Sequence, residues 1–283
     1  MKTGLNAKSM FGEEPYQIRA RKALPILVRQ AIAQKTIYYS DLAQEMDMPN
    51  PRNLNYVLGS VGQTLRELEK KWSQKIPMIQ SIVINKNTKQ PGEGIDEFLL
   101  DVDFRNLPEK NKRILIKNKL QEVFLYEKWS KVLEELALEP VQSDFSSLNK
   151  KASSFYEGGE GEEHKKLKNF VANNPALFNL PSSIAPGEME YSLPSGDSLD
   201  VFFSYNNMHI GIEVKSHISD SADIARGMYQ CIKYQAVLEA RQAANGQSQN
   251  VRTFLVLGGE LPNELLPLKN ILGVTILEEI KYI

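Results

Sequence analysis

The sequence is poor in the side chains that usually mark a metal–thiolate site or a disulfide-stapled fold. Its 283 residues include one cysteine, three histidines and two tryptophans. A lone Cys231 cannot form an intrachain disulfide framework or a cysteine-based zinc site, and we interpret it as a small residue packed in a helix. His217 has no partner at metal-ligand spacing, and we expect all the histidines, which also include His164 and His209, to be structural or exposed.

The chain also lacks a charge excess and long apolar runs. Its 34 basic and 35 acidic residues leave a net charge of −1, so nucleic-acid binding would depend on local patches and not on a global basic field. No apolar run reaches membrane-spanning length, and the first residues, MKTGLNAKSMFGEE, lack a signal-peptide core. We expect a soluble, cytoplasmic protein with no membrane partner, whose length suits two domains or one large one.

The most informative stretch is LDVFFSYNNMHIGIEVK, residues 199–215, which predicts a β-hairpin. Apolar and other residues alternate along both arms, as expected for strands with two distinct faces. Asn206 and Asn207 lie between the arms, and asparagine tolerates the positive φ of a two-residue hairpin turn. With these residues as the turn, Asp200 is predicted to lie directly opposite Glu213, with Lys215 on the same face.

Two facing carboxylates repel each other at a cost of up to about 1 kcal/mol, so folding alone gives no reason for this pairing. A divalent cation does, because two carboxylate oxygens from adjacent strands suit Mg²⁺, which keeps several water ligands. The ammonium of Lys215 could then position or deprotonate an attacking water. The alternative interpretation is a solvent-facing hairpin with scattered charged residues.

The first hundred residues have the pattern of a winged helix-turn-helix. Apolar spacing predicts a helix over residues 15–34 that Pro25 kinks or breaks. A short β-like stretch then precedes a helix for which Ser40 is a plausible N-cap. A second helix follows over residues 53–72, and residues 79–84 are predicted to form a strand before a polar loop.

These segments resemble the C-terminal winged-helix domain of the alkylguanine-DNA alkyltransferases, over roughly residues 30–95. The resemblance rests on YYSDLAQEMDMP, NYVLGSVGQTL, IPMIQSIVIN and PGEG. Where that family has Pro-Cys-His-Arg, this chain has PMIQ, residues 77–80, so the acceptor thiol is missing and alkyl transfer is not implied. DNA binding through the second helix is implied, with these candidate contacts: Tyr39, Ser40, Arg52, Asn53, Asn55 and Lys86. The alternative is a helical domain that only packs against the rest.

A long amphipathic helix is predicted over residues 109–138, with a basic first half that either touches DNA or forms a solvated face. The composition then shifts to Ser, Gly, Asn and charged residues over 139–161, where we expect a domain boundary. The predicted organisation is a winged-helix-like domain (1–105), a connecting helix and linker (106–156) and a second domain (157–283).

The second domain is predicted to be α/β, with the element order αβββαβ in a mixed sheet. Its leading helix has an inward stripe through Leu167, Phe170 and Val171, which places Glu163 near the stripe's centre. That carboxylate either complements the helix dipole or points into the fold as a site residue. A later helix, capped by Asp220 or Ser221, brings Gln230 and Tyr234 onto one face.

Together these residues resemble the PD-(D/E)XK nuclease superfamily, in its RecB-like branch with a Q-x-x-x-Y motif, over about residues 157–260. The resemblance implies that Asp200, Glu213 and the Val214 carbonyl bind Mg²⁺ (or Mn²⁺) and that Lys215 orients or deprotonates the attacking water. It further implies that Glu163 holds a second metal or a metal-bound water, that Gln230 fixes the water or Lys215, and that Tyr234 contacts the DNA backbone. One departure is that no proline precedes Asp200. Asp197 is a rival for that position but is out of register with Glu213.

The resemblance therefore predicts a Mg²⁺-dependent DNA endonuclease, of the kind found in restriction or anti-phage defence. A homodimer is expected because cutting both strands usually needs two sites, and partner subunits of a defence system are a further expectation. The alternatives are a non-catalytic DNA-binding regulator with a vestigial nuclease fold and a nuclease directed at RNA.

Overall fold

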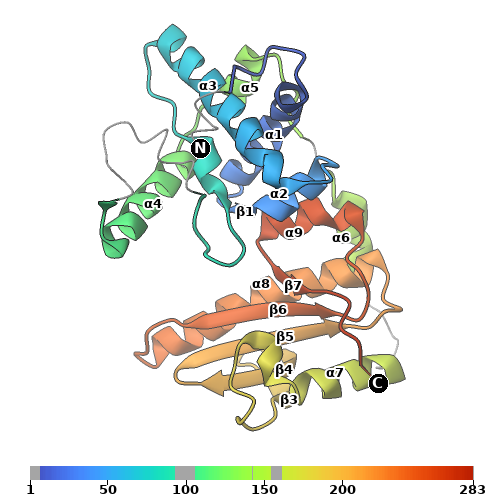
Figure 1. The fold of residues 1–283 in the computed structure, drawn as a ribbon. Coiled ribbons are helices and arrows are strands. Elements are labelled where there is room, and N and C mark those ends of the chain that lie inside the picture. Colours follow the sequence, from blue (N-terminus) through green and yellow to red (C-terminus); the bar gives the residue numbers. More distant parts are fainter. Residues whose placement is uncertain (1–6, 93–105, 142, 154–160, 283) are drawn as a thin grey trace. The chain divides into compact units, whose positions relative to one another are not determined.

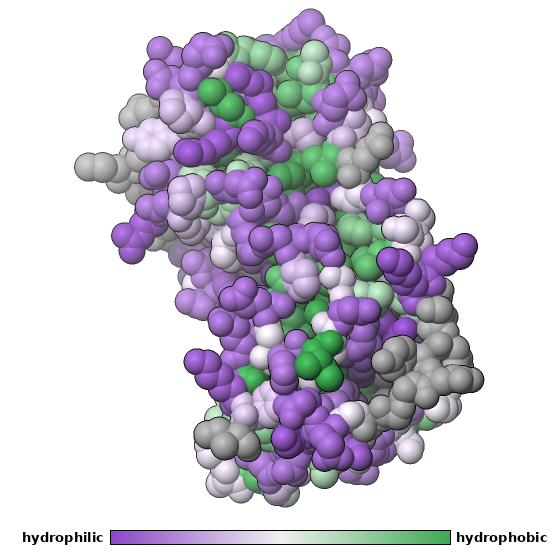
Figure 2. Space-filling model, turned by 90° about the vertical axis from the view of Figure 1, so that its right-hand side faces the viewer, coloured by the Kyte–Doolittle hydropathy of each residue, from purple (hydrophilic) through white to green (hydrophobic). Residues whose placement is uncertain are grey.

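The computed structural model describes residues 7–92, 106–141, 143–153 and 161–282. The chain divides into two compact units, Met1–Ser143 and Asp144–Ile283, each of which combines helices with a sheet (Figure 1). Among the helices described, none has the length and apolar character needed to cross a membrane. Hydrophilic residues predominate on the face seen in Figure 2, where apolar residues form separate small groups.

The first unit is mainly helical. Its helices are α1 (Pro15–Ile32), α2 (Tyr39–Glu45), α3 (Leu54–Trp72), α4 (Glu109–Phe124) and α5 (Trp129–Glu135), with 3₁₀ turns η1 (Pro51–Asn53) and η2 (Ile79–Ile82). Two short strands, β1 (Ile37–Tyr38) and β2 (Val83–Ile84), pair in parallel. The chain then forms a tight polar hairpin in which Ile84 bridges to Pro91.

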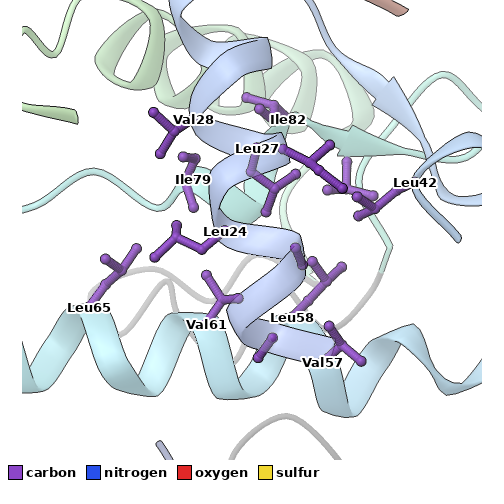
Figure 3. Packing of buried hydrophobic residues seen from close by; sticks show 14 of the residues in the cluster. Leu24, Leu27, Val28, Leu42, Val57, Leu58, Val61, Leu65, Ile79 and Ile82 are labelled. Carbon is purple, nitrogen blue, oxygen red and sulfur yellow. The ribbon is translucent and has the colours of Figure 1, made fainter. Parts of the chain in front are cut away.

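Helix α1 crosses α3 and packs against it to build the core of this unit (Figure 3). Both present apolar side chains at helical spacing, so one face of each is buried. Leu24 and Leu27 of α1 belong to one buried cluster with Val61 and Leu65 of α3, and Ile79 of η2 is part of the same cluster. The core extends through α4 and α5, which makes these helices part of the first unit.

Three sequence predictions for this unit need correction. The predicted kink or break at Pro25 is not a break, because α1 continues through Pro25 as one helix. The missing N–H costs one hydrogen bond, while the surrounding face remains buried. Helix α2 begins at Tyr39 with Tyr38 as its N-cap, so Ser40 is not the cap. The predicted strand 79–84 is a buried 3₁₀ turn followed by only two strand residues, since a short apolar run fits either structure.

The predicted connector, 106–156, is divided between the units. Helices α4 and α5 replace the single helix expected over 109–138. The Trp129 indole N–H, in the first turn of α5, donates a hydrogen bond to the Val123 carbonyl near the end of α4 at 2.8 Å. Helix α6 (Ser146–Ser153) packs instead against α8 of the second unit. The predicted domain limits at 105 and 156 both lie in stretches outside the described residues.

The second unit is a five-stranded mixed sheet between helices. Its elements are α7 (Glu162–Ala172), η5 (Pro175–Phe178), β3 (Glu188–Ser192), β4 (Ser198–Tyr205), β5 (Met208–Lys215), α8 (Ser221–Ala244), β6 (Val251–Leu257), η6 (Asn263–Leu265), α9 (Leu266–Leu272) and β7 (Thr275–Leu277). The strand order is β3-β4-β5-β6-β7, with antiparallel pairing from β3 to β5 and parallel pairing from β5 to β7. This α/β arrangement agrees with the predicted fold class.

Helices α7 and α8 cover opposite faces of this sheet (Figure 1). Leu167 and Val171 of α7 pack on one face against β4 and β5. Met228 and Leu238 of α8 belong to the apolar clusters on the other face. Strand β5 is thus covered on both sides, and all residues from Ile210 to Lys215 are buried.

The β4–β5 hairpin has the predicted turn and register. Asn206 and Asn207 adopt φ values of 47° and 62°, as the two central residues of a type I′ turn require. Tyr205 pairs with Met208, and the pairing continues to Val201 and Ile212. The predicted pairing of Asp200 with Glu213 lies one step beyond these residues and is not formed.

Candidate active site

At Asp200, a side-chain hydrogen bond replaces the backbone hydrogen bonds that join β4 and β5. The last paired residues are Val201 and Ile212. The next N–H on that side of β5, at Val214, donates instead to Asp200 Oδ2 at 2.7 Å. Because the N–H and C=O of one strand residue point to the same neighbouring strand, the Val214 carbonyl also points toward β4.

Beside Asp200 lies a buried ion pair on the α8 face of β5. Glu213 and Lys215 are only 4% and 7% exposed, and Lys215 Nζ lies 3.1 Å from Glu213 Oε1. A second carboxylate, Asp223 in the first turn of α8, lies 3.2 Å from the same Nζ. Gly227 lets α8 approach this closely, since a Cβ there would lie 3.1 Å from Lys215 Cε and 2.8 Å from Leu255 Cδ1.

Burial and the neighbouring charge of Asp200 raise the pKa of Glu213 to about 8, although Lys215 opposes the shift. For Lys215 the balance is reversed. Burial alone would lower its pKa, but Glu213 and Asp223 raise the pKa above its ordinary value. The surroundings therefore favour the charged form of Lys215, whereas burial and the nearby Asp200 disfavour the charged form of Glu213.

The donor set fits a hard divalent cation. Two carboxylates and a backbone carbonyl are all oxygen ligands, and an added positive charge would reverse the repulsion between Asp200 and Glu213. Gln230 Oε1 is also buried without a hydrogen-bond partner. In the described parts of the chain no cluster of three or more His, Cys, Asp or Glu side chains could hold a metal by itself, so water would have to complete the coordination of such an ion.

Tyr234 does not have the position expected from the resemblance. Its side chain is 2% exposed, and its hydroxyl donates to the Ser198 carbonyl at 3.1 Å while accepting from Gln230 Nε2 at 3.1 Å. Burial, with smaller effects from Glu213 and Asp200, raises its pKa. The structure therefore does not favour a DNA-backbone contact by Tyr234, because its hydroxyl orients Gln230 and ties α8 to β4.

From α7, the residue that reaches Asp200 is His164 and not Glu163. His164 Nε2 lies 3.3 Å from Asp200 Oδ1. Glu163 is engaged by Lys166 at 2.8 Å, by the Tyr282 hydroxyl at 3.3 Å and by His217 at 3.9 Å. Its predicted role as a second metal ligand finds no support in these contacts.

The helix stripe explains this exchange. Lys168 is 5% exposed and pairs with Glu190, whereas Phe170 is only partly buried. The inward face of α7 therefore runs through His164, Leu167 and Lys168, and the sequence prediction had rotated it toward Phe170. Because lysine is not apolar, the pattern of apolar residues did not show that Lys168 faces inward. The predicted inward face therefore included Glu163 instead of His164.

The other histidines lie outside this arrangement. His217 is exposed, and its Nδ1 lies 3.1 Å from the Tyr282 hydroxyl. His209 packs edge-on against Phe202, and burial, with Arg241 nearby, lowers its pKa. Cys231 is fully buried, as predicted, and burial raises its pKa.

Most predicted DNA contacts of the first unit are exposed. Arg52 and Asn53 lie in η1, Asn55 lies in the first turn of α3, and Lys86 lies in the polar hairpin after β2. Ser40 is exposed and donates to Asp41 Oδ1 at 3.0 Å.

Tyr39 is the exception among these candidates. Its hydroxyl accepts from the Gly92 N–H at 3.1 Å, and burial raises its pKa. A phosphate contact by this hydroxyl is therefore not favoured by the structure, because the group is already used to hold the hairpin.

Sequence reasoning missed Asp223 and the contact of His164. Asp220 caps α8, as predicted, and its side chain accepts a hydrogen bond from the Asp223 N–H at 2.8 Å. Asp223 lies three residues after this cap. A second acid in the first turn of a helix is also what the helix dipole favours, so nothing in the sequence distinguished this residue from a helix-end charge.

Comparisons of the chain with protein-family models, with curated proteins and with solved structures return no match.

Proposed function

We propose that the second unit hydrolyses DNA phosphodiesters as a Mg²⁺-dependent (or Mn²⁺-dependent) endonuclease. One geometric observation carries the proposal. The Asp200 carboxylate takes over the Val214 N–H at the end of the β4–β5 ladder, beside the buried Glu213–Lys215 pair. The order α7-β3-β4-β5-α8-β6 supports the same proposal, because it has the αβββαβ sequence of a PD-(D/E)XK core.

In this proposal Asp200, Glu213 and the Val214 carbonyl would hold the ion. When bound, Mg²⁺ supplies Lewis-acid stabilisation of the charge that develops on the phosphoryl oxygens. Water adds to phosphorus and loses a proton to the surrounding solvent. The bond to the 3′-oxygen breaks, and that oxygen takes up a proton. The resemblance implies that a 5′-phosphate end is left.

The protein's own groups orient the attacking water. Lys215 keeps its proton because two carboxylates surround it, so it acts as a hydrogen-bond donor and a positive charge, and not as the base. Gln230 offers its unpartnered amide oxygen as an acceptor. Tyr234 fixes the orientation of that amide.

The first unit is proposed to hold DNA through the start of α3 and the hairpin after β2. Arg52, Asn53, Asn55 and Lys86 are exposed there, and a helix N-terminus presents N–H groups that suit phosphate. A homodimer would supply one site for each strand. A restriction or anti-phage role is part of this proposal and rests on the resemblance alone.

The decisive experiment is cleavage of supercoiled plasmid by the full-length protein. Nicked or linear product should form with Mg²⁺, disappear with EDTA and disappear in Lys215→Ala. Lys165→Ala is the matched control, because Lys165 is an exposed lysine of the same unit paired with Glu162, and it should cut like the unchanged protein. Equal cutting by Lys215→Ala and the unchanged protein would overturn the assignment.

The substrate class is tested in parallel arms with linear DNA, single-stranded DNA and structured RNA. Cutting of RNA alone would make the protein a ribonuclease with the same site. DNA binding without Mg²⁺-dependent cutting of any substrate would favour the non-catalytic DNA-binding alternative.

A further inference from the structure

Lys215 has two carboxylate partners, although one would neutralise it. Its Nζ lies 3.1 Å from Glu213 Oε1 and 3.2 Å from Asp223 Oδ1. A lysine that is 7% exposed has no bulk water to replace a lost partner. If Glu213 turned toward a cation, Lys215 would need another anion within reach.

We propose that Asp223 is a positioning residue that retains the Lys215 ammonium when Glu213 binds a divalent cation. This inference rests on the function proposed above, because it assigns Glu213 to the ion. Without Asp223, the ammonium would either stay on Glu213 and compete with the ion or lose its fixed position. With Asp223, one carboxylate is released for the ion and the other keeps the lysine directed at the site.

Asp223 is itself held from both sides. Its backbone N–H donates to Asp220 Oδ1 at 2.8 Å, which fixes it in the first turn of α8. Arg226 Nη1 lies 3.3 Å from Asp223 Oδ1, the same oxygen that faces Lys215. The carboxylate is therefore shared between a guanidinium and the ammonium, and its position is determined by both.

Arg226 links this pair to α6. Its Nε donates to the Ala152 carbonyl at 2.7 Å, and Tyr229 one turn along donates its hydroxyl to Asn149 Oδ1 at 2.6 Å. The contacts thus run from α6 through Arg226 and Asp223 to Lys215. Displacing α6 would change where the lysine is held.

The direct test is the ammonium signal of Lys215 in ¹⁵N-labelled full-length protein. A buried, paired ammonium exchanges slowly and gives a resolved signal, which Lys215→Ala identifies by its loss. We expect the signal to persist when Mg²⁺ is added to the unchanged protein. In Asp223→Asn with Mg²⁺ it should broaden or vanish.

Asp220→Asn is the matched control. It removes one carboxylate from the same helix end, asparagine caps a helix about as well as aspartate, and Asp220 has no described contact with Lys215. Its Lys215 signal should match that of the unchanged protein. A signal unaffected by Asp223→Asn, or lost equally in Asp220→Asn, would overturn the proposal.

Cleavage kinetics provide the second readout. Asp223→Asn should lower kcat by about 10- to 100-fold, as loss of an outer-shell partner typically does, with KM for DNA unchanged, and Asp223→Glu should restore part of the rate. In a Lys215→Ala background Asp223→Asn should have no further effect, and an additive loss would contradict the assignment. If no variant cuts but the ammonium signal behaves as expected, the endonuclease proposal fails while the positioning of Lys215 stands.

Discussion

At the scale of single residues, Glu213 combines burial with a nearby like charge. Its pKa is raised from 4.5 to about 8, so the folded state holds a proton that the unfolded chain releases. For a group with a raised folded-state pKa, stability is highest below the unfolded pKa and falls as pH rises through the folded one. The metal-free protein should therefore lose stability between about pH 4.5 and pH 8 through this group.

The first prediction compares Glu213→Gln with the unchanged protein in EDTA. Glutamine cannot ionise, so the variant should be more stable than the unchanged protein at pH 9, and the difference should shrink at pH 6. Lys215 does not interfere in this range, because its raised pKa places its own loss of stability above the ordinary lysine value of 10.5. Urea unfolding at the two pH values measures the effect, and equal differences at both would contradict it.

The second prediction concerns Tyr234→Phe. The change removes the hydroxyl that donates to the Ser198 carbonyl, and loss of such a bond costs about 0.5–1.5 kcal/mol. Because the ring is buried, DNA affinity should not change. Fluorescence anisotropy with labelled duplex measures affinity and thermal unfolding measures stability. A weaker complex with unchanged stability would restore the role expected from the resemblance.

At the scale of elements, the β4–β5 hairpin depends on two asparagines with positive φ. The third prediction is that Asn206→Ala destabilises the second unit by up to about 1–2 kcal/mol, because alanine lacks the short polar side chain whose local hydrogen bonds let asparagine adopt the left-handed conformation. Asn206→Gly should be neutral or stabilising, because glycine adopts this conformation freely. Chemical denaturation of the two variants tests this, and equal stability would mean that the turn does not determine the register.

The hairpin was predictable because its information is local. Alternation assigns the faces, and Asn-Asn assigns the turn and therefore the register. The position where the ladder opens was not predictable. Glu190, which the register of β3 and β4 brings level with Asp200, has φ of 54°, and Leu199 joins Leu238 on the α8 face. This twist depends on packing between β3, β4 and α8, which sequence periodicity does not report.

Two other elements show the same limit. The apolar run before β2 looks like a strand, yet Ile79 and Ile82 pack into the α1–α3 core from a 3₁₀ turn. In α7, Lys168 faces inward and pairs with Glu190. The apolar pattern does not reveal an inward lysine, so the sequence predicted Glu163 at the position toward Asp200 that His164 occupies in the structure. In both cases a tertiary contact decided the structure that a short pattern left open.

At the scale of the whole molecule, each unit has its own apolar core. Leu24 belongs to the buried cluster between α1 and α3 in the first unit, and Ile212 belongs to the cluster beneath α7 in the second. Separate cores allow separate cooperative transitions. The proposed ion site lies wholly in the second unit, so ligand binding should stabilise only that unit.

The fourth prediction follows for calorimetry of the full-length protein. Leu24→Ala and Ile212→Ala each remove a fully buried side chain and should lower different transitions, by a loss of about 2–5 kcal/mol in the unit concerned. Mg²⁺ should raise only the transition that Ile212→Ala lowers, and Asp200→Asn should abolish that rise without moving the transition that Leu24→Ala lowers. A single transition lowered by both core variants, or a Mg²⁺ shift that survives Asp200→Asn, would mean that the units unfold together or that the ion binds elsewhere.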